Sequence, residues 1–163
     1  MAPLTKPLNI SAGEALRAKG LTLATAESCT GGLLSKLITD VAGSSEYFRG
    51  GVVAYADDAK EALVGVRART LEKHGAVSME TAGEMARKVK KGIKASIGVS
   101  ITGIAGPGGA RPGKPVGIVY IGASKGRDTV VKKFLFKGKR ALIRQRSAEE
   151  ALKLILRFAR GYV

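Results

Sequence analysis

The 163 residues of this chain are enough for one domain with a buried core, and a hydrophobic share of 45% excludes a disordered protein. Aromatic residues make up only 5% and tryptophan is absent, so aliphatic side chains must form the core, which favours packed layers of helices and sheet. The net charge of +15 favours phosphate-bearing ligands, with solubility or heat adaptation alone as the alternative.

The cysteine content and the hydropathy bear on the cellular compartment in which we expect the protein. Cys29 is the only cysteine, which excludes an intrachain disulfide and is typical of a reducing environment. The first ten residues do not resemble a secretory signal, and no apolar run approaches the ~20 residues of a membrane span. We therefore expect a cytoplasmic protein that does not engage a membrane.

The first half of the chain predicts alternating helices and strands. Ser11 and Glu14 have the spacing of a capping box, which predicts a helix that begins there and stops at Gly20. The elements expected next, in chain order, are a strand over 21–26, a helix after Gly32, a strand over 52–55, a helix capped by Asp57 or Asp58, a helical turn from Thr70, and a helix capped by Ser78.

The second half predicts a hairpin and a terminal helix. The expected elements are a strand over 97–101, a loop rich in Gly and Pro over 102–115, strands over 116–123 and 129–136 around a turn at 125–128, and a long helix from Arg140. Because β-α-β units precede a hairpin, the sheet should be mixed. We predict a single domain over residues 1–163, of the α/β class, folded as a three-layer α/β/α sandwich.

The segment 25–32, Thr-Ala-Glu-Ser-Cys-Thr-Gly-Gly, lies where a strand passes into a helix. Such a junction offers free N–H groups and the positive end of a helix dipole, which suits attack on a carbonyl, although helix capping alone would also explain the segment. Ser28 and Cys29 are the possible nucleophiles, and in a strand they would point to opposite faces. The only histidine, His74, is distant in sequence, which favours Ser28.

A hydrolase built on this chain needs an unusual base. Because the chain has one histidine and one cysteine, we expect neither a zinc site nor a Ser-His-Asp triad around Ser28. Lys60, five residues after Tyr55, is the candidate, because Ser-Lys pairs are known in hydrolases. A lysine acts as a base only where burial or positive charge lowers its pKa, and a solvated helix lysine is the alternative.

Two glycine-rich loops follow. Residues 108–115 have the G-x-x-x-x-G-K spacing of a phosphate-binding loop, but Pro115 replaces the magnesium-binding hydroxyl and a strand follows where a helix should, which argues against a nucleoside triphosphatase. Residues 102–107 leave the carboxyl end of a strand, where α/β folds place ligands, and their N–H groups could hold an anion or form a plain turn.

Together these segments resemble the C-terminal domain family of competence/damage-inducible protein CinA, whose stand-alone members are nicotinamide-nucleotide amidohydrolases. The resemblance covers roughly residues 8–160. It rests on six ordered blocks: 25–32, 42–45, 55–60, 74–78, 102–107 and 114–117.

The resemblance implies hydrolytic deamidation of nicotinamide mononucleotide to nicotinic acid mononucleotide and ammonia, without metal or cofactor. It implies Ser28 as nucleophile, Lys60 as base and Tyr55 as an aid to proton transfer. We also expect a homo-oligomer, because small α/β enzymes of this kind commonly self-associate, and no specific nucleic-acid partner. The positions that match the substrate-binding residues of the family are Thr30, Gly31, Gly32, Ser44, Ser45, Thr102, Gly103, Gly106 and Arg140.

One departure from the family pattern keeps an alternative open. Asp57 stands where the family often has Asn, and a carboxylate there could raise the pKa of Lys60 and weaken it as a base. The alternative is a module of the same fold that binds a nucleotide without hydrolysing it. Nucleic-acid binding through the basic segment 111–160 is a third hypothesis, against which the scarcity of aromatic residues for base stacking argues.

Overall fold

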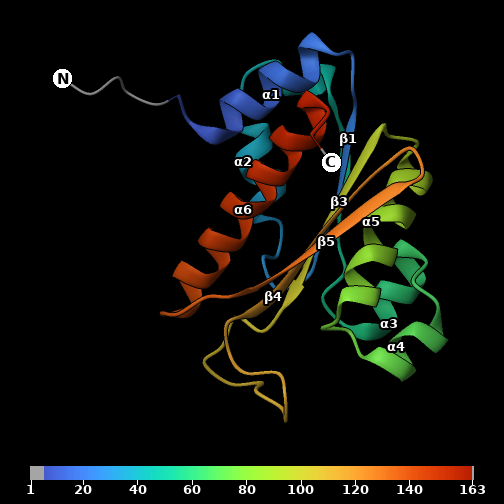
Figure 1. Ribbon diagram of the computed structural model, residues 1–163, viewed down its shortest axis with the longest axis vertical. Helices are drawn as coiled ribbons and strands as arrows, with labels where there is room; N and C mark the ends of the chain where they lie inside the picture. Colours follow the sequence, from blue (N-terminus) through green and yellow to red (C-terminus); the bar gives the residue numbers. More distant parts are fainter. Residues whose placement is uncertain (1–5, 163) are drawn as a thin grey trace.

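The computed structural model describes residues 6–162, which are built around a five-stranded β-sheet (Figure 1). The strands are β1 (Leu23–Glu27), β2 (Phe48–Val53), β3 (Ile97–Gly103), β4 (Ile118–Lys125) and β5 (Asp128–Leu135). Their order across the sheet is β2-β1-β3-β4-β5. β1 is parallel to β2 and β3, whereas β4 is antiparallel to β3 and β5. The predicted mixed sheet is therefore confirmed.

Helices cover both faces of this sheet (Figure 1). One layer consists of α1 (Leu8–Ala18), α2 (Leu33–Thr39) and α6 (Arg140–Arg160). The other consists of α3 (Asp57–Ala59), a π-helical turn (Lys60–Val64), α4 (Ala68–His74) and α5 (Met79–Ile93). The predicted three-layer α/β/α sandwich is confirmed. No helix among residues 6–162 combines the length and the apolar character needed to cross a bilayer.

Glycines in the central strands let α5 pack closely on the sheet. A Cβ at Gly122 would lie 2.8 Å from the carbonyl oxygen of Ala82 in α5. A Cβ at Gly98 would collide with the carbonyl oxygen of Ala86, one turn further along the same helix. Both strands are buried on this face, so only a residue without a side chain fits between strand and helix backbone.

The predicted helix caps have mixed outcomes. The capping box is wrong: α1 begins at Leu8 after Pro7, and Glu14 pairs instead with Lys6 at 2.7 Å. Capping by the side chain of Asp57 or Asp58 is also wrong, because Ala56 is the N-cap of α3. The cap at Ser78 is confirmed, since its hydroxyl accepts a 3.2 Å hydrogen bond from the N–H of Thr81.

The carboxyl ends of three neighbouring parallel strands meet at one edge of the sheet. Glu27, the last residue of β1, is paired with Val53 at the end of β2 and with Ile101 near the end of β3. The antiparallel strand β5 ends at the same edge, and α6 begins shortly after it. The loops after β1, β2 and β3 and the start of α6 are therefore brought together from distant parts of the sequence.

Candidate active site

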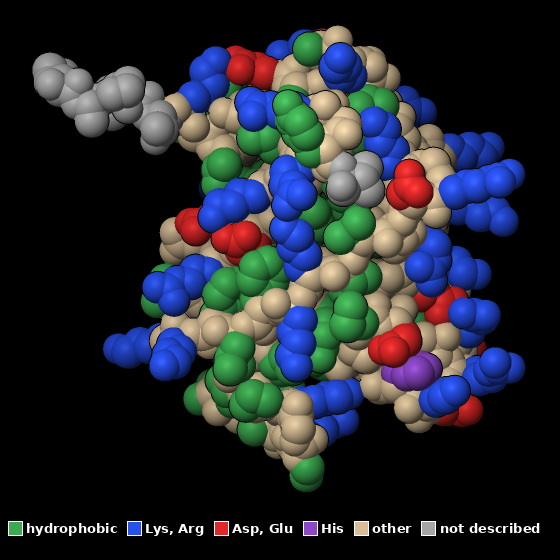
Figure 2. Space-filling view, in the orientation of Figure 1, with side chains coloured by type: hydrophobic (Ala, Val, Ile, Leu, Met, Phe, Trp, Pro, Cys, Tyr) green, Lys and Arg blue, Asp and Glu red, His purple; other side chains and the backbone are tan. Residues whose placement is uncertain are grey.

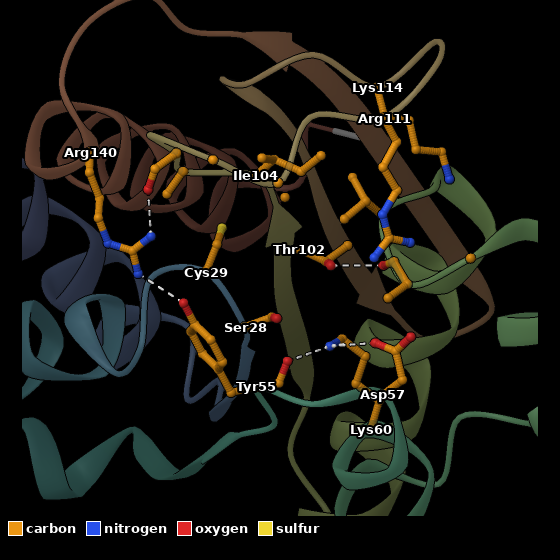
Figure 3. Close-up of a pocket in the computed structure, with 18 residues that line it drawn as sticks. Ser28, Cys29, Tyr55, Asp57, Lys60, Thr102, Ile104, Arg111, Lys114 and Arg140 are labelled. Carbon is orange, nitrogen blue, oxygen red and sulfur yellow. Dashed lines mark hydrogen bonds and ion pairs between the residues drawn. The ribbon is translucent and has the colours of Figure 1, made fainter.

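A cavity of about 260 Å³ lies at this carboxyl edge (Figure 3). The loops after β1, β2 and β3, the α4–α5 loop and the first residue of α6 line it. Many of the residues expected from the sequence meet here: Ser28, Tyr55, Lys60, Thr102, Gly103, Gly106 and Arg140. The structure thus assembles the three expected catalytic side chains around one cavity.

The turn that carries Ser28 is fixed by a buried carboxylate. Glu27 is fully buried, and one of its oxygens accepts hydrogen bonds from the N–H groups of Gly32 (3.1 Å) and Leu34 (3.0 Å). The other accepts from the N–H (2.8 Å) and the hydroxyl (2.7 Å) of Ser35. Glu27 therefore caps α2 from the preceding strand, a role that the sequence analysis did not assign. Its signal was an acidic residue just before a helix N-terminus.

These contacts change which N–H groups remain for an oxyanion. The N–H of Gly32 is occupied by Glu27, and that of Gly31 donates to the carbonyl of Ser28 at 3.0 Å. In the described part of the chain, the N–H groups of Cys29 and Thr30 donate to no other residue. Of these two residues only Cys29 lines the cavity, so among the N–H groups of the turn its N–H is the one available to an oxyanion there.

Both possible nucleophiles line the cavity, so the expectation that they point to opposite faces of a strand is wrong: β1 ends at Glu27, and Ser28 and Cys29 lie in the turn that follows. Backbone pairing and the pKa of the thiol distinguish them. Ser28 extends the pairing of β1 by donating its N–H to the carbonyl of Ile101 at 2.9 Å, and its side chain lines the cavity. Cys29 is buried, and burial raises the pKa of its thiol to about 11. The thiol is thus protonated near neutral pH and is a poor nucleophile. Ser28 is the better candidate.

Lys60 is buried, with only 2% of its surface exposed, and opens the π-helical turn. Its Nζ donates to the carbonyls of Tyr55 (3.0 Å) and Ala56 (3.4 Å) and lies 3.6 Å from Oδ1 of Asp57. Burial lowers the pKa of Lys60, and the nearby Asp57 carboxylate acts in the opposite direction. The net pKa of Lys60 is below its ordinary value. The Asp57 carboxylate therefore raises this pKa, as expected, but burial lowers it by more.

Tyr55 and Arg140 form a bridge at the mouth of the cavity (Figure 3). Nη2 of Arg140 donates to the Tyr55 hydroxyl at 2.8 Å, while Nη1 donates to the carbonyl of Gly106, also at 2.8 Å. Tyr55 is 58% exposed as a residue, and Lys60 contacts its backbone carbonyl rather than its hydroxyl. Arg140 therefore ties the loop after β2 to the loop after β3.

Several expected binding residues lie outside the cavity. Thr30, Gly31 and Gly32 do not line it, and the carbonyl of Thr30 instead accepts a 2.7 Å hydrogen bond from Arg144. Ser44 and Ser45 form a short 3-10 turn that precedes β2. That turn lies at the opposite edge of the sheet, because the start of β2 pairs with the start of β1. Within one chain, Ser44 and Ser45 are therefore not brought to Ser28.

The other missed residues lie in the loop between β3 and β4. Arg111 and Lys114 line the cavity, on the side away from Arg140 (Figure 3). Nζ of Lys114 donates to the carbonyl of His74 at 2.9 Å. Neither residue was among the site residues expected from the sequence, although the charged residues of this imperfect phosphate-binding loop were an available signal.

The fold and the cavity define a class: an α/β/α domain with a serine and a buried lysine at the carboxyl edge of parallel strands. The model of the CinA C-terminal domain family matches residues 5–159. The chain belongs to this family.

Relatives and solved structures agree with this assignment. The chain is 53% identical over 146 residues to a "Putative competence-damage inducible protein" of Caldanaerobacter subterraneus, with 90% of this chain and 35% of the relative covered. A "CinA-like protein" of Kosmotoga olearia is 51% identical over 142 residues, with 87% and 34% covered. The chain thus spans about a third of the length of these relatives. The crystal structure of the competence damage-inducible protein A from Klebsiella pneumoniae has a TM-score of 0.92 at 32% identity, with 96% of this chain and 97% of that chain covered.

Proposed function

We propose that this protein is an amidohydrolase that converts nicotinamide mononucleotide to nicotinic acid mononucleotide and ammonia. The observation that carries the proposal is a buried Lys60 of lowered pKa on the same cavity as Ser28. A lysine of lowered pKa is neutral in a larger fraction of molecules and can accept a proton from a serine hydroxyl.

The proposed reaction has two stages. Oγ of Ser28 attacks the carboxamide carbon while its proton passes to Nζ of Lys60. The N–H of Cys29 stabilises the oxyanion, an effect worth about 3 kcal/mol per donor in other enzymes. Lys60 returns the proton as the carbon–nitrogen bond breaks and ammonia leaves. Water then hydrolyses the acyl-enzyme ester and restores the Ser28 hydroxyl.

Tyr55 has a supporting part in this proposal. Its hydroxyl is held by Arg140 in the free protein, and Lys60 binds only its carbonyl. An aid to proton transfer requires the Tyr55 hydroxyl to turn from Arg140 toward Lys60 when substrate binds. Until then, the bridge keeps the aromatic ring at the mouth of the cavity.

An ammonia-release assay with nicotinamide mononucleotide tests the proposal. The wild-type chain should release ammonia, Ser28→Ala should abolish release, and Cys29→Ala should retain it if circular dichroism shows that the variant is folded. Absence of product even at high enzyme concentration contradicts the proposal. Loss with Cys29→Ala but not with Ser28→Ala would show that the nucleophile is Cys29.

The second candidate is a module that binds the nucleotide without hydrolysing it. Two carbonyls and the Asp57 carboxylate surround Nζ of Lys60, an arrangement that favours the ammonium form over the base. Recovery of intact nicotinamide mononucleotide after long incubation, together with measurable binding, would favour this candidate.

A further inference from the structure

A short hairpin in the loop between β3 and β4 presents two cations to the cavity. The N–H of Arg111 donates to the carbonyl of Lys114 at 3.0 Å, and the N–H of Lys114 donates back at 2.8 Å. Residues paired in this way carry their side chains on the same face of a hairpin. Pro112 and Gly113 form the turn, with a φ of +72° at Gly113 that glycine adopts readily. Both side chains therefore reach the same rim.

Arg111 and Lys114 both have N–H donors that are not engaged in hydrogen bonds with the described residues. Lys114 uses one hydrogen of Nζ for the carbonyl of His74, and this bond anchors the hairpin to the end of α4. The guanidinium of Arg111 makes no hydrogen bond or ion pair with residues 6–162. By contrast, Arg140 already has two of its five N–H donors engaged with the protein.

The positive charges of Arg111 and Lys114 are also not balanced by a carboxylate on their side of the cavity. Asp57 is the one acidic residue among the described residues that line the cavity, and it lies 3.6 Å from Nζ of Lys60. Figure 3 shows Asp57 beside Lys60 and shows Arg111 and Lys114 on another side of the cavity. The hairpin therefore contributes two positive charges without a neighbouring carboxylate, which suits an anionic group.

We propose that Arg111 and Lys114 bind the phosphate of the substrate and make the site selective for phosphorylated over unphosphorylated amides. This inference rests on the proposed function and deepens it. The guanidinium of Arg111 supplies two parallel N–H donors to phosphate oxygens, and the ammonium of Lys114 adds a point charge. Ser45, one of the substrate-binding positions expected from the family resemblance, lies in a turn at the opposite edge of the sheet and does not reach this cavity within one chain.

The test compares ammonia release from nicotinamide mononucleotide and from its riboside, which lacks the phosphate. Arg111→Ala should lower kcat/KM for the mononucleotide about tenfold, through KM, and leave the riboside unchanged. Arg111→Lys should restore part of the loss. The control is Arg127→Ala, which removes the same charge from the turn between β4 and β5, at the opposite edge of the sheet. Equal losses for both substrates, or no loss for either, would overturn the proposal.

A binding measurement separates this proposal from the proposed reaction. Calorimetric titration uses nicotinic acid mononucleotide, which has no amide to hydrolyse. If wild type binds it and Arg111→Ala binds it about tenfold more weakly, the phosphate site stands even where no ammonia is released. If Arg111→Ala binds it as tightly as wild type, or if wild type does not bind it, the phosphate site is wrong.

Discussion

Glu27 and Lys60 are both buried ionisable residues near Ser28, but they are stabilised differently. The carboxylate of Glu27 accepts four hydrogen bonds from the start of α2, so its charge is well compensated. Lys60 has two carbonyl acceptors and the Asp57 carboxylate at 3.6 Å, and its pKa is lowered by burial. The first residue gives the turn its shape, whereas the second has the lowered pKa on which the proposed function rests.

Asp57→Asn should shift the pH dependence of activity. The carboxylate of Asp57 raises the pKa of Lys60 against the larger effect of burial, so its removal lowers that pKa further. If neutral Lys60 is the base, kcat/KM rises with pH as Lys60 loses its proton. The rise in the variant should therefore occur at lower pH, with more activity near neutrality, as measured by ammonia release across a pH series.

Asp58→Asn is the matched control for this prediction. Asp58 also raises the pKa of Lys60, but as the smallest of the contributing causes, and its carboxylate accepts the N–H of Ala59 at 2.8 Å. Its pH profile should move less than that of Asp57→Asn. An unchanged profile in Asp57→Asn, or a shift to higher pH, would show that Lys60 is not the base.

At the scale of elements, the close packing of α5 on the sheet connects the fold to the site. The helix packs on β3 and β4 where Gly98 and Gly122 replace side chains with backbone contact. β3 also carries Thr102, whose hydroxyl donates to the carbonyl of Ala76 in the loop before α5 at 2.8 Å. Close packing of α5 therefore also sets one wall of the cavity.

A pair of glycine substitutions tests this packing. Gly98→Ala should lower the free energy of unfolding by about 1–3 kcal/mol, because the new methyl collides with the carbonyl of Ala86. Gly92→Ala, on the exposed side of α5 with nothing near its Cβ position, should instead stabilise the protein by up to about 1 kcal/mol. Urea denaturation measures both. Equal effects would contradict the close contact.

At the scale of the whole molecule, positive charge is spread widely. Figure 2 shows Lys and Arg side chains scattered over the visible face rather than gathered into one stripe. Such a distribution makes the electrostatic potential around the protein positive and attracts anions in general. Arg111 and Lys114, the two cations of the hairpin, act locally instead. The homo-oligomer expected from the sequence stays a prediction, which light scattering after size exclusion checks.

Binding to random duplex DNA should follow from this distribution and should be weak. Counterion release makes such binding steeply dependent on salt, so it should be measurable by fluorescence anisotropy at about 0.05 M salt and vanish by about 0.3 M. A nucleic-acid function would instead show binding that survives the higher salt or prefers one sequence. The charge-neutral probe for comparison is a peptide nucleic acid duplex, which should not bind at either salt concentration.

The sequence predicted those parts of the site that follow directly from strand ends. Ser28 and Thr102 were found because the carboxyl ends of parallel strands meet at one edge. Within one chain, Ser44 and Ser45 lie at the opposite edge of the sheet from Ser28, a position that motif resemblance does not show. Arg111 was missed because only the register of its hairpin turns it toward the cavity.

The same limit applies to local capping. Ser11 and Glu14 have the spacing of a capping box, but the helix begins three residues earlier at Leu8, after Pro7. Pro7 is the N-cap of this helix, a position whose N–H takes no part in the hydrogen bonds within the helix, so a proline there removes none of them. Glu27 caps α2 from another element, through a turn whose path the spacing of residues does not reveal.

The cap supplied by Glu27 has a consequence for how selectivity can change. Because a carboxylate already neutralises the start of α2, that helix has little positive field to offer a ligand. Attraction for an anion must come from side chains such as Arg111, which lies on a surface hairpin remote in sequence from Ser28. Substitutions in that hairpin can therefore alter which substrates bind while the turn around Ser28 keeps its shape, so ligand preference and reaction chemistry can evolve separately.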